Sequence, residues 1–174
     1  MVEKFGFEVH QLTALFLINL VINIFAAPLF GYFIAHFGER RALLIEYSGL
    51  ICVFLAYGGI YLFDWGVVIA AMLFILDHLF FGLRIALKTY FQKISSPEDI
   101  APTAAVALSI NHIAAIFLPV LLGLLWLVSP AIVFLAAAFL AFLSLLLALL
   151  VPKLPIYGNE NVMMSEFIRN KNRE

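Results

Sequence analysis

The residues best suited to chemistry lie inside long apolar segments. Asp77, Arg84 and Lys88 follow the spacing i, i+7, i+11, so a regular helix would place them on one face. A charge at membrane depth costs several kcal/mol, and the side chain of Asp77 is too short to reach a surface. Asp77 must therefore be paired, protonated or in contact with water, which makes it a candidate for proton or solute binding. The long side chains of Arg84 and Lys88 have a second interpretation, in which they extend to the membrane surface.

Three further polar residues are candidates for the same site. His78 follows Asp77 directly, and Asn111 and His112 lie in a later apolar segment at a depth close to that of Arg84. An imidazole can change its charge near neutral pH. The alternative for Asn111 and His112 is a pair of hydrogen bonds between helices, each worth about 1 kcal/mol or less. Adjacent helical side chains point about 100° apart, so Asp77 and His78 are not expected to form a catalytic dyad.

The sequence contains none of the common enzyme motifs. There is no HExxH, GxSxG, phosphate loop or GxGxxG. Cys52 is the only cysteine, which excludes an intrachain disulfide and a metal site built from cysteines. A net charge of −1 does not favour nucleic-acid binding. We therefore expect no enzyme activity, no cofactor and no metal.

The composition indicates a polytopic membrane protein of the all-α class. Of the 174 residues, 65% are apolar and 12% are charged, and the mean hydropathy is +1.09. Soluble domains carry about 25% charged residues, and disordered chains are far less hydrophobic. A spanning helix needs about 20 apolar residues, which predicts a five-helix transmembrane domain over 1–151 and a cytoplasmic tail over 152–174. The predicted spans are approximately 11–36, 42–62, 66–91, 102–128 and 131–151.

Local signals support these boundaries. No Asp, Glu, Lys or Arg occurs between Ile100 and Pro152, a stretch too long for one span, so we expect a turn at 128–130. Ser96 followed by Pro97 and two acids predicts the start of a helix. The fifth span has Ser144 as its one polar residue, which predicts a lipid-facing position at the edge of the bundle.

The basic residues predict the orientation in the membrane. Cytoplasmic loops carry an excess of Lys and Arg. In the five-span arrangement, Lys4 lies on one side and the other nine basic residues on the opposite side: Arg40, Arg41, Arg84, Lys88, Lys93, Lys153, Arg169, Lys171 and Arg173. This distribution predicts a multi-pass protein of the cell (plasma or inner) membrane, with the N-terminus outside and the C-terminus in the cytoplasm.

Small residues and prolines predict how the helices pack. Two stripes recur every four residues, namely Ala27, Gly31 and Ala35 in the first span and Ala101, Ala105 and Ser109 in the fourth. Such stripes allow helix backbones to approach closely. Pro28 and Pro119 lie inside spans and are expected to bend or loosen them, and Asn19 and Asn23 are expected to hold helices together.

The segment between the first two spans, 31–41, has a distinctive pattern. It resembles the cytoplasmic loop signature of the major facilitator superfamily, Gly-x-x-x-Asp-x-x-Gly-Arg-Arg/Lys. Gly31, Gly38 and Arg40 match, and Arg41 is also basic, whereas Ala35 replaces the acid and Glu39 an arginine. Three later runs, over 90–94, 97–101 and 110–113, are similar to a subgroup of prokaryotic facilitators. The resemblance covers about residues 5–155.

The resemblance implies a fold and a function. The five spans would correspond to the eighth to twelfth helices of a twelve-helix carrier, so the chain would be a truncated or split portion of the second half. It would form part of a secondary transporter for a small solute, coupled to ions or protons, with its binding site near mid-membrane. A second polypeptide supplying the missing helices, or self-association, would be needed. The alternative is a non-transporting accessory or scaffold subunit, or an inactive remnant.

Overall fold

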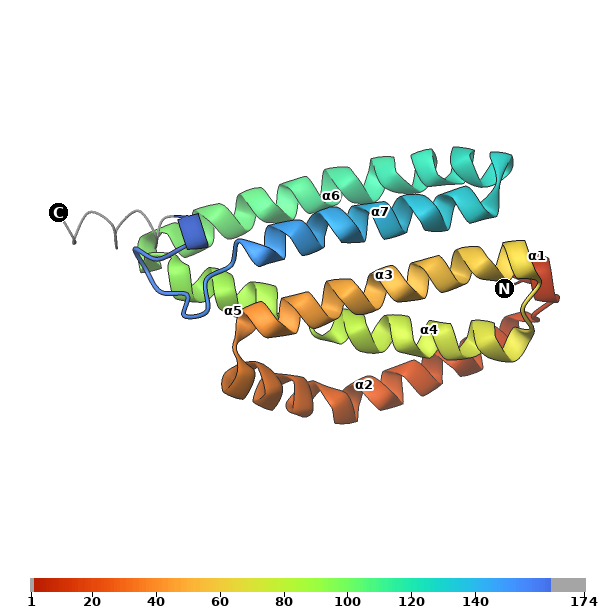
Figure 1. The fold of residues 1–174 in the computed structure, drawn as a ribbon, viewed down its shortest axis with the longest axis horizontal. Coiled ribbons are helices and arrows are strands. Elements are labelled where there is room, and N and C mark those ends of the chain that lie inside the picture. The colour runs from red at the N-terminus through yellow and green to blue at the C-terminus, as the bar shows by residue number, and fades with distance from the viewer. Residues whose placement is uncertain (1, 164–174) are drawn as a thin grey trace.

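The computed structural model describes residues 2–163, and the side chains from Lys4 onward. Helices make up almost all of this part of the chain, and it contains no strand beyond an isolated bridge between Ile156 and Asn159. The helices are α1 (Val2–Phe5), α2 (Val9–Phe37), α3 (Glu39–Phe63), α4 (Val67–Gly82), α5 (Ile85–Ile94), α6 (Pro97–Val128) and α7 (Pro130–Leu149). Figure 1 shows α2 to α7 running roughly along one common direction.

Five segments are long and apolar enough to cross a membrane, as predicted. They are α2, α3, the α4–α5 pair, α6 and α7. The predicted turn at 128–130 is confirmed, since Ser129 separates α6 from α7. The predicted start at Ser96 is confirmed as well, because its Oγ accepts a 3.3 Å hydrogen bond from the backbone N–H of Asp99.

The third span differs from the prediction because it is broken. α4 ends at Gly82 and α5 begins at Ile85. Around the break the backbone N–H groups of Leu83 and Arg84 donate to carbonyls three residues back, at 3.0 and 3.1 Å. Such bonds are typical of a tighter 3₁₀ turn. Discontinuous helices in transporters commonly lie near binding sites.

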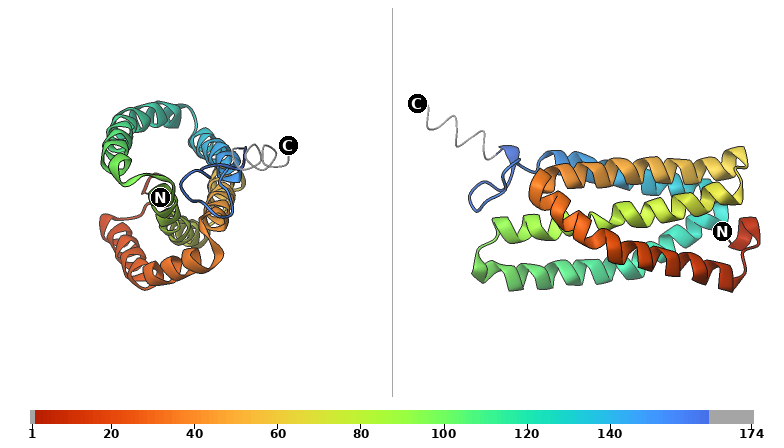
Figure 2. Two further views of the ribbon diagram at one scale, coloured as in Figure 1. Left: turned by 90° about the vertical axis from the view of Figure 1, so that its left-hand side faces the viewer. Right: turned by 90° about the horizontal axis from the view of Figure 1, so that it is seen from below.

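α3 is the centre of the bundle. It packs against α7, α4, α5 and α2, whereas α6 packs mainly on α7. In the end-on view of Figure 2, α2, α3, α7 and α6 form an open arc, and α4 lies on its inner side. The expectation that the fifth span lies at the edge is therefore wrong for this chain, because α7 lies between α3 and α6 and buries four alanines.

The two predicted stripes of small residues do not pack within the chain. All six residues are exposed, and a Cβ added at Gly31 would meet nothing within 4 Å. Close approach occurs instead at two other glycines. A Cβ at Gly49 of α3 would lie 2.4 Å from the ring of Phe80, and one at Gly82 of α4 would lie 2.3 Å from the ring of Phe30. The aromatic side chains of neighbouring helices thus occupy these two glycine notches.

The prolines lie inside helices as expected. Pro28 is in α2, which curves along its length in Figure 1, and Pro119 is in α6. A helical proline removes one backbone hydrogen bond, which accounts for bending in α2.

The first part of the predicted tail folds back onto the bundle. The hydroxyl of Tyr90 donates a hydrogen bond to the carbonyl of Glu160, and the N–H of Val162 donates to the carbonyl of Leu150 at 2.9 Å. Val151, Pro152 and Pro155 are buried. The basic residues of the predicted tail at 169, 171 and 173 lie outside the described residues.

Candidate functional site

Asp77 and His78 form a polar pair in the interior of α4. Nδ1 of His78 lies 3.6 Å from Oδ2 of Asp77 and 3.0 Å from the carbonyl oxygen of Phe74. The two side chains are 29% and 32% exposed, so the packing of this chain does not enclose either of them. Although adjacent helical positions point about 100° apart, the imidazole of His78 folds back along its own helix to the carbonyl of Phe74, which brings Nδ1 near Asp77.

Aromatic side chains from two other helices surround this pair. Phe16 of α2 meets the rings of His78 and Phe74 edge-on, at centroid distances of 6.2 and 5.1 Å. Tyr57 of α3 interacts electrostatically with Asp77. The pair therefore lies where α2, α3 and α4 meet, about 15 Å along the helix from the start of α4 at 1.5 Å per residue.

Asn19 of α2, one turn beyond Phe16, was expected only to hold helices together. Its side chain is 2% exposed, and neither its amide nitrogen nor its oxygen has a hydrogen-bond partner. The neighbouring Asn23 donates its side-chain N–H to the backbone carbonyl of Asn19 at 2.9 Å, and not to the side-chain amide of Asn19. Leaving a buried polar group unsatisfied costs about 1–3 kcal/mol, so the side chain of Asn19 is suited to bind a polar group. The sequence signal, an Asn in an apolar span, did not distinguish it from Asn23.

Arg84 lies in the break between α4 and α5 rather than on a continuous helix. Its side chain is exposed and its guanidinium carbon lies 5.2 Å from the centre of the Phe81 ring. Among the described residues the ion pair of Asp77 is with His78, and no ion pair includes Arg84. Asp77 and Arg84 therefore lie on the same span without forming an ion pair with each other.

Asn111 and His112 do not join this cluster. Both are exposed on α6, which has no buried residue and packs mainly on α7 rather than on α4. The structure of this chain therefore does not bring these two candidates into the cluster of Asp77 and His78, and their part in the same site stays a prediction. Asn and His on an exposed helix face at membrane depth need partners that lipid cannot supply.

Two buried acids on α3 were not among the predicted site residues. Glu39 and Glu46 are both 2% exposed, seven residues apart and so on one face of the helix. Glu39 forms an ion pair with Lys93 of α5 at 2.5 Å. Glu46 interacts electrostatically with Arg84, and its Oε2 has no hydrogen-bond partner. The presence of Glu46 in an apolar span was a signal that could have identified it.

The predicted loop motif is a single-residue turn. Gly38 separates α2 from α3 with φ of 85°, a left-handed conformation that favours glycine. Gly31 lies inside α2 and takes no part in the turn, while Arg40 and Arg41 lie in the first turn of α3. A cavity of about 450 Å³ adjoins the turn, with Glu39, Lys93 and Lys153 in its wall.

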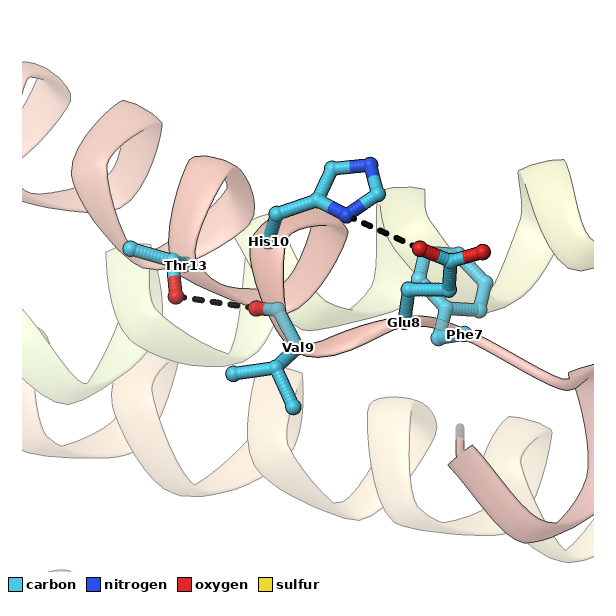
Figure 3. Close-up of a pocket in the computed structure, with 5 residues that line it drawn as sticks. All are labelled: Phe7, Glu8, Val9, His10 and Thr13. Atoms are coloured by element: carbon cyan, nitrogen blue, oxygen red, sulfur yellow. Dashed lines mark hydrogen bonds and ion pairs between the residues drawn. The ribbon is translucent and has the colours of Figure 1, made fainter.

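The opposite end of the bundle has its own polar contacts. Lys4 forms a 3.0 Å ion pair with Asp64 and donates a 2.6 Å hydrogen bond to the carbonyl of Ile60. An open pocket at the start of α2, shown in Figure 3, is lined by Phe7, Glu8, Val9, His10 and Thr13. The lining residues of this pocket do not include Asp77 or His78. Within residues 2–163 no group of three metal-ligating side chains is suited to hold a metal ion.

A scan against protein-family models finds none that matches the chain. Searches of curated proteins and of solved structures find no match either. The function is therefore argued from the residues and their geometry.

Proposed function

We propose that this chain forms one wall of a secondary transporter for a small solute, with Asp77 and His78 as the proton- or solute-binding pair. The observation that carries the proposal is a partly exposed acid–imidazole pair inside the membrane-length segment formed by α4 and α5. Intramembrane ionisable residues are costly and commonly mark ion or substrate pathways. The buried amide of Asn19 and the helix break near Arg84 support a binding role for the same region, as does the resemblance of 31–41 to facilitator loops.

The second part of the proposal is that the wall is incomplete without another polypeptide or another copy. α6 has no buried residue, and its Asn111 and His112 are exposed. A polar face against lipid is unfavourable, so a partner that packs on α6 would stabilise it. This partner would also supply the opposite wall of the site.

The transport role is tested by proton flux in vesicles that contain the chain with any partner that co-purifies. A trapped pH-sensitive dye reports the flux under an imposed gradient. Asp77→Asn is expected to abolish the flux and leave membrane insertion intact, because it removes the titratable group but keeps its size. Asp64→Asn is the matched control, since Asp64 is an exposed acid at the bundle end. Flux that persists unchanged in Asp77→Asn contradicts the transport role.

The partner is tested separately by photo-crosslinking. A photoreactive amino acid at position 112 is expected to give a crosslinked adduct, to another polypeptide or to a second copy. The same probe at Phe139, an exposed position on α7, is the control and is expected to label mainly lipid. A monodisperse monomer that transports solute by itself would contradict the requirement for a partner.

The exposed face of α6 also favours a second candidate function, that of an accessory subunit that binds a membrane protein without transporting anything. The two functions differ in what Asp77→Asn does to the assembly. An accessory subunit would keep both its partner and the activity of the complex in this variant, whereas a transporter wall would keep the partner and lose the flux.

We also propose that the N-terminus lies outside a cell membrane and the C-terminus in the cytoplasm. Arg40, Arg41, Lys93 and Lys153 lie at the end of the bundle that holds the α2–α3 turn, whereas Lys4 at the other end is paired with Asp64. In a Cys52→Ser background, an impermeant maleimide added to intact cells is expected to label Asp64→Cys and not Lys153→Cys. Labelling of Lys153→Cys alone would reverse the orientation.

A further inference from the structure

Glu46 is a fully buried acid without a bonded partner. Its side chain is 2% exposed and Oε2 accepts no hydrogen bond. The ion pairs among the described residues involve Glu8, Glu39, Asp64 and Asp77, so none of them includes Glu46. An ionised carboxylate in an apolar interior is strongly unfavourable unless a cation and hydrogen bonds compensate it.

The charged group that interacts with Glu46 from a neighbouring element is Arg84, at the α4–α5 break. In this conformation the guanidinium lies exposed over the ring of Phe81 instead of bonding the carboxylate. Tyr47, next to Glu46 on α3, interacts with both groups. The nearby core shared by α2, α3, α5 and α7 consists of apolar residues, among them Ile34, Leu43, Ala86 and Ala148.

We propose that Glu46 is a proton-binding site, neutral in this conformation, and that the proton and the guanidinium of Arg84 compete for its carboxylate. Uptake forms one O–H bond on the carboxylate with a proton from water, and release restores the charge that Arg84 can then pair. The 3₁₀ turn at the break and the long side chain of Arg84 provide the freedom for this exchange. The proposal does not depend on transport, because it concerns the charge state of one carboxyl in the folded chain.

The test is labelling of the full chain in detergent with dicyclohexylcarbodiimide, an apolar reagent that adds to protonated carboxyl groups, mapped by mass spectrometry of peptides. Glu39 is the matched control, since it is as buried as Glu46 on the same face of the same helix but forms an ion pair with Lys93. At about pH 7 Glu46 is expected to be labelled and Glu39 is not. Lys93→Ala is expected to make Glu39 reactive, which shows that the reagent reaches this face.

Three variants sharpen the result. Arg84→Gln is expected to raise the labelled fraction of Glu46 at a fixed pH, because it removes the competing cation, whereas Lys88→Gln is expected to leave it unchanged. Glu46→Gln is expected to remove the infrared band of a protonated carboxyl. Since the label is mapped in the unaltered chain, the test does not require that Glu46→Gln folds.

An unlabelled Glu46 together with a reactive Glu39 in Lys93→Ala would overturn the proposal. If neither acid reacts in any variant, the infrared spectrum decides, and an absence of the protonated band in the unaltered chain overturns it. A labelled fraction of Glu46 that does not respond to Arg84→Gln would overturn the competition with Arg84.

Discussion

Two acids on one face of α3 are equally buried, yet the bundle compensates their charges differently. Glu39 lies at the first position of the helix, where α5 ends close by and Lys93 reaches its carboxylate. Glu46 lies about two turns, or 10.5 Å, further along, where the neighbouring segment has broken and Arg84 is directed away to Phe81. The difference teaches that burial alone does not decide whether an acid has a charged partner, because a cation from another element must be placed beside it.

The largest expected change in the free energy of unfolding comes from removing the cation beside Glu39, which leaves this acid without an ion pair, as Glu46 is. Lys93→Ala leaves a buried carboxylate without its cation and is expected to lower the free energy of unfolding by about 1.5–3 kcal/mol, the range for hydrogen bonds to charged groups. The value stays below that of a fully buried pair because Lys93 is 52% exposed. Denaturant unfolding in detergent measures it.

Two controls accompany this variant. Lys88→Ala removes an exposed cation that has no ion pair among the described residues and is expected to change stability by less than about 0.5 kcal/mol. Adding Glu39→Gln to Lys93→Ala is expected to recover part of the loss, because the unpaired charge disappears. Equal stabilities of Lys93→Ala and the unaltered chain would mean that the pair contributes nothing.

The next effect concerns the packing that excludes water near Glu46. Gly49 is one turn further along α3, and its notch holds the ring of Phe80 from α4. Gly49→Ala is expected to cost about 1–3 kcal/mol through overpacking, measured by the same unfolding assay. The smaller side chain in Phe80→Leu is expected to relieve part of this cost in the double variant.

Gly31→Ala is the matched control for Gly49→Ala. It lies in a helix as well, but a Cβ there meets nothing within 4 Å. Because alanine favours a helix over glycine by about 0.5–1 kcal/mol, this variant is expected to be neutral or slightly stabilising. Similar losses in both variants would mean that helix propensity, rather than the contact with Phe80, limits substitution.

The smallest effect is expected at Glu46 itself. Glu46→Gln resembles the protonated acid in size and polarity and breaks no ion pair, so the free energy of unfolding is expected to change by less than about 1 kcal/mol. Glu39→Gln, in contrast, loses the ion pair with Lys93 and is expected to be the more destabilising of the two. A loss at Glu46 as large as that of Lys93→Ala would show that Glu46 has a charged partner.

The spans were predictable because their signals are local. Hydropathy identified five segments, and Ser96 with Pro97 and the 128–130 turn marked helix ends by residue type alone. The break in the third span was not predicted. No proline lies between Gly82 and Ile85, so only the altered backbone hydrogen bonds reveal the break.

The candidate site was predictable in its residue types and only partly in its arrangement. Asp77 and His78 were identified because polar groups in apolar spans are rare, and the structure brings them together. Asn111 and His112 were candidates for the same site, but α6 packs mainly on α7 rather than on α4. Equal depth in two helices does not specify which helices are neighbours.

What the sequence by itself determined is the all-helical class, the number of membrane-length segments and their ends, because hydropathy, proline and capping act over a few residues. Only the tertiary structure decided that, among the described residues, Glu39 has an ion pair and Glu46 has none, that the Asn19 amide is unbonded, and that α6 presents an exposed face. Each of these depends on which side chain a distant segment places nearby. A helical pattern specifies a face of its own helix, and the packing of the bundle supplies what lies against that face.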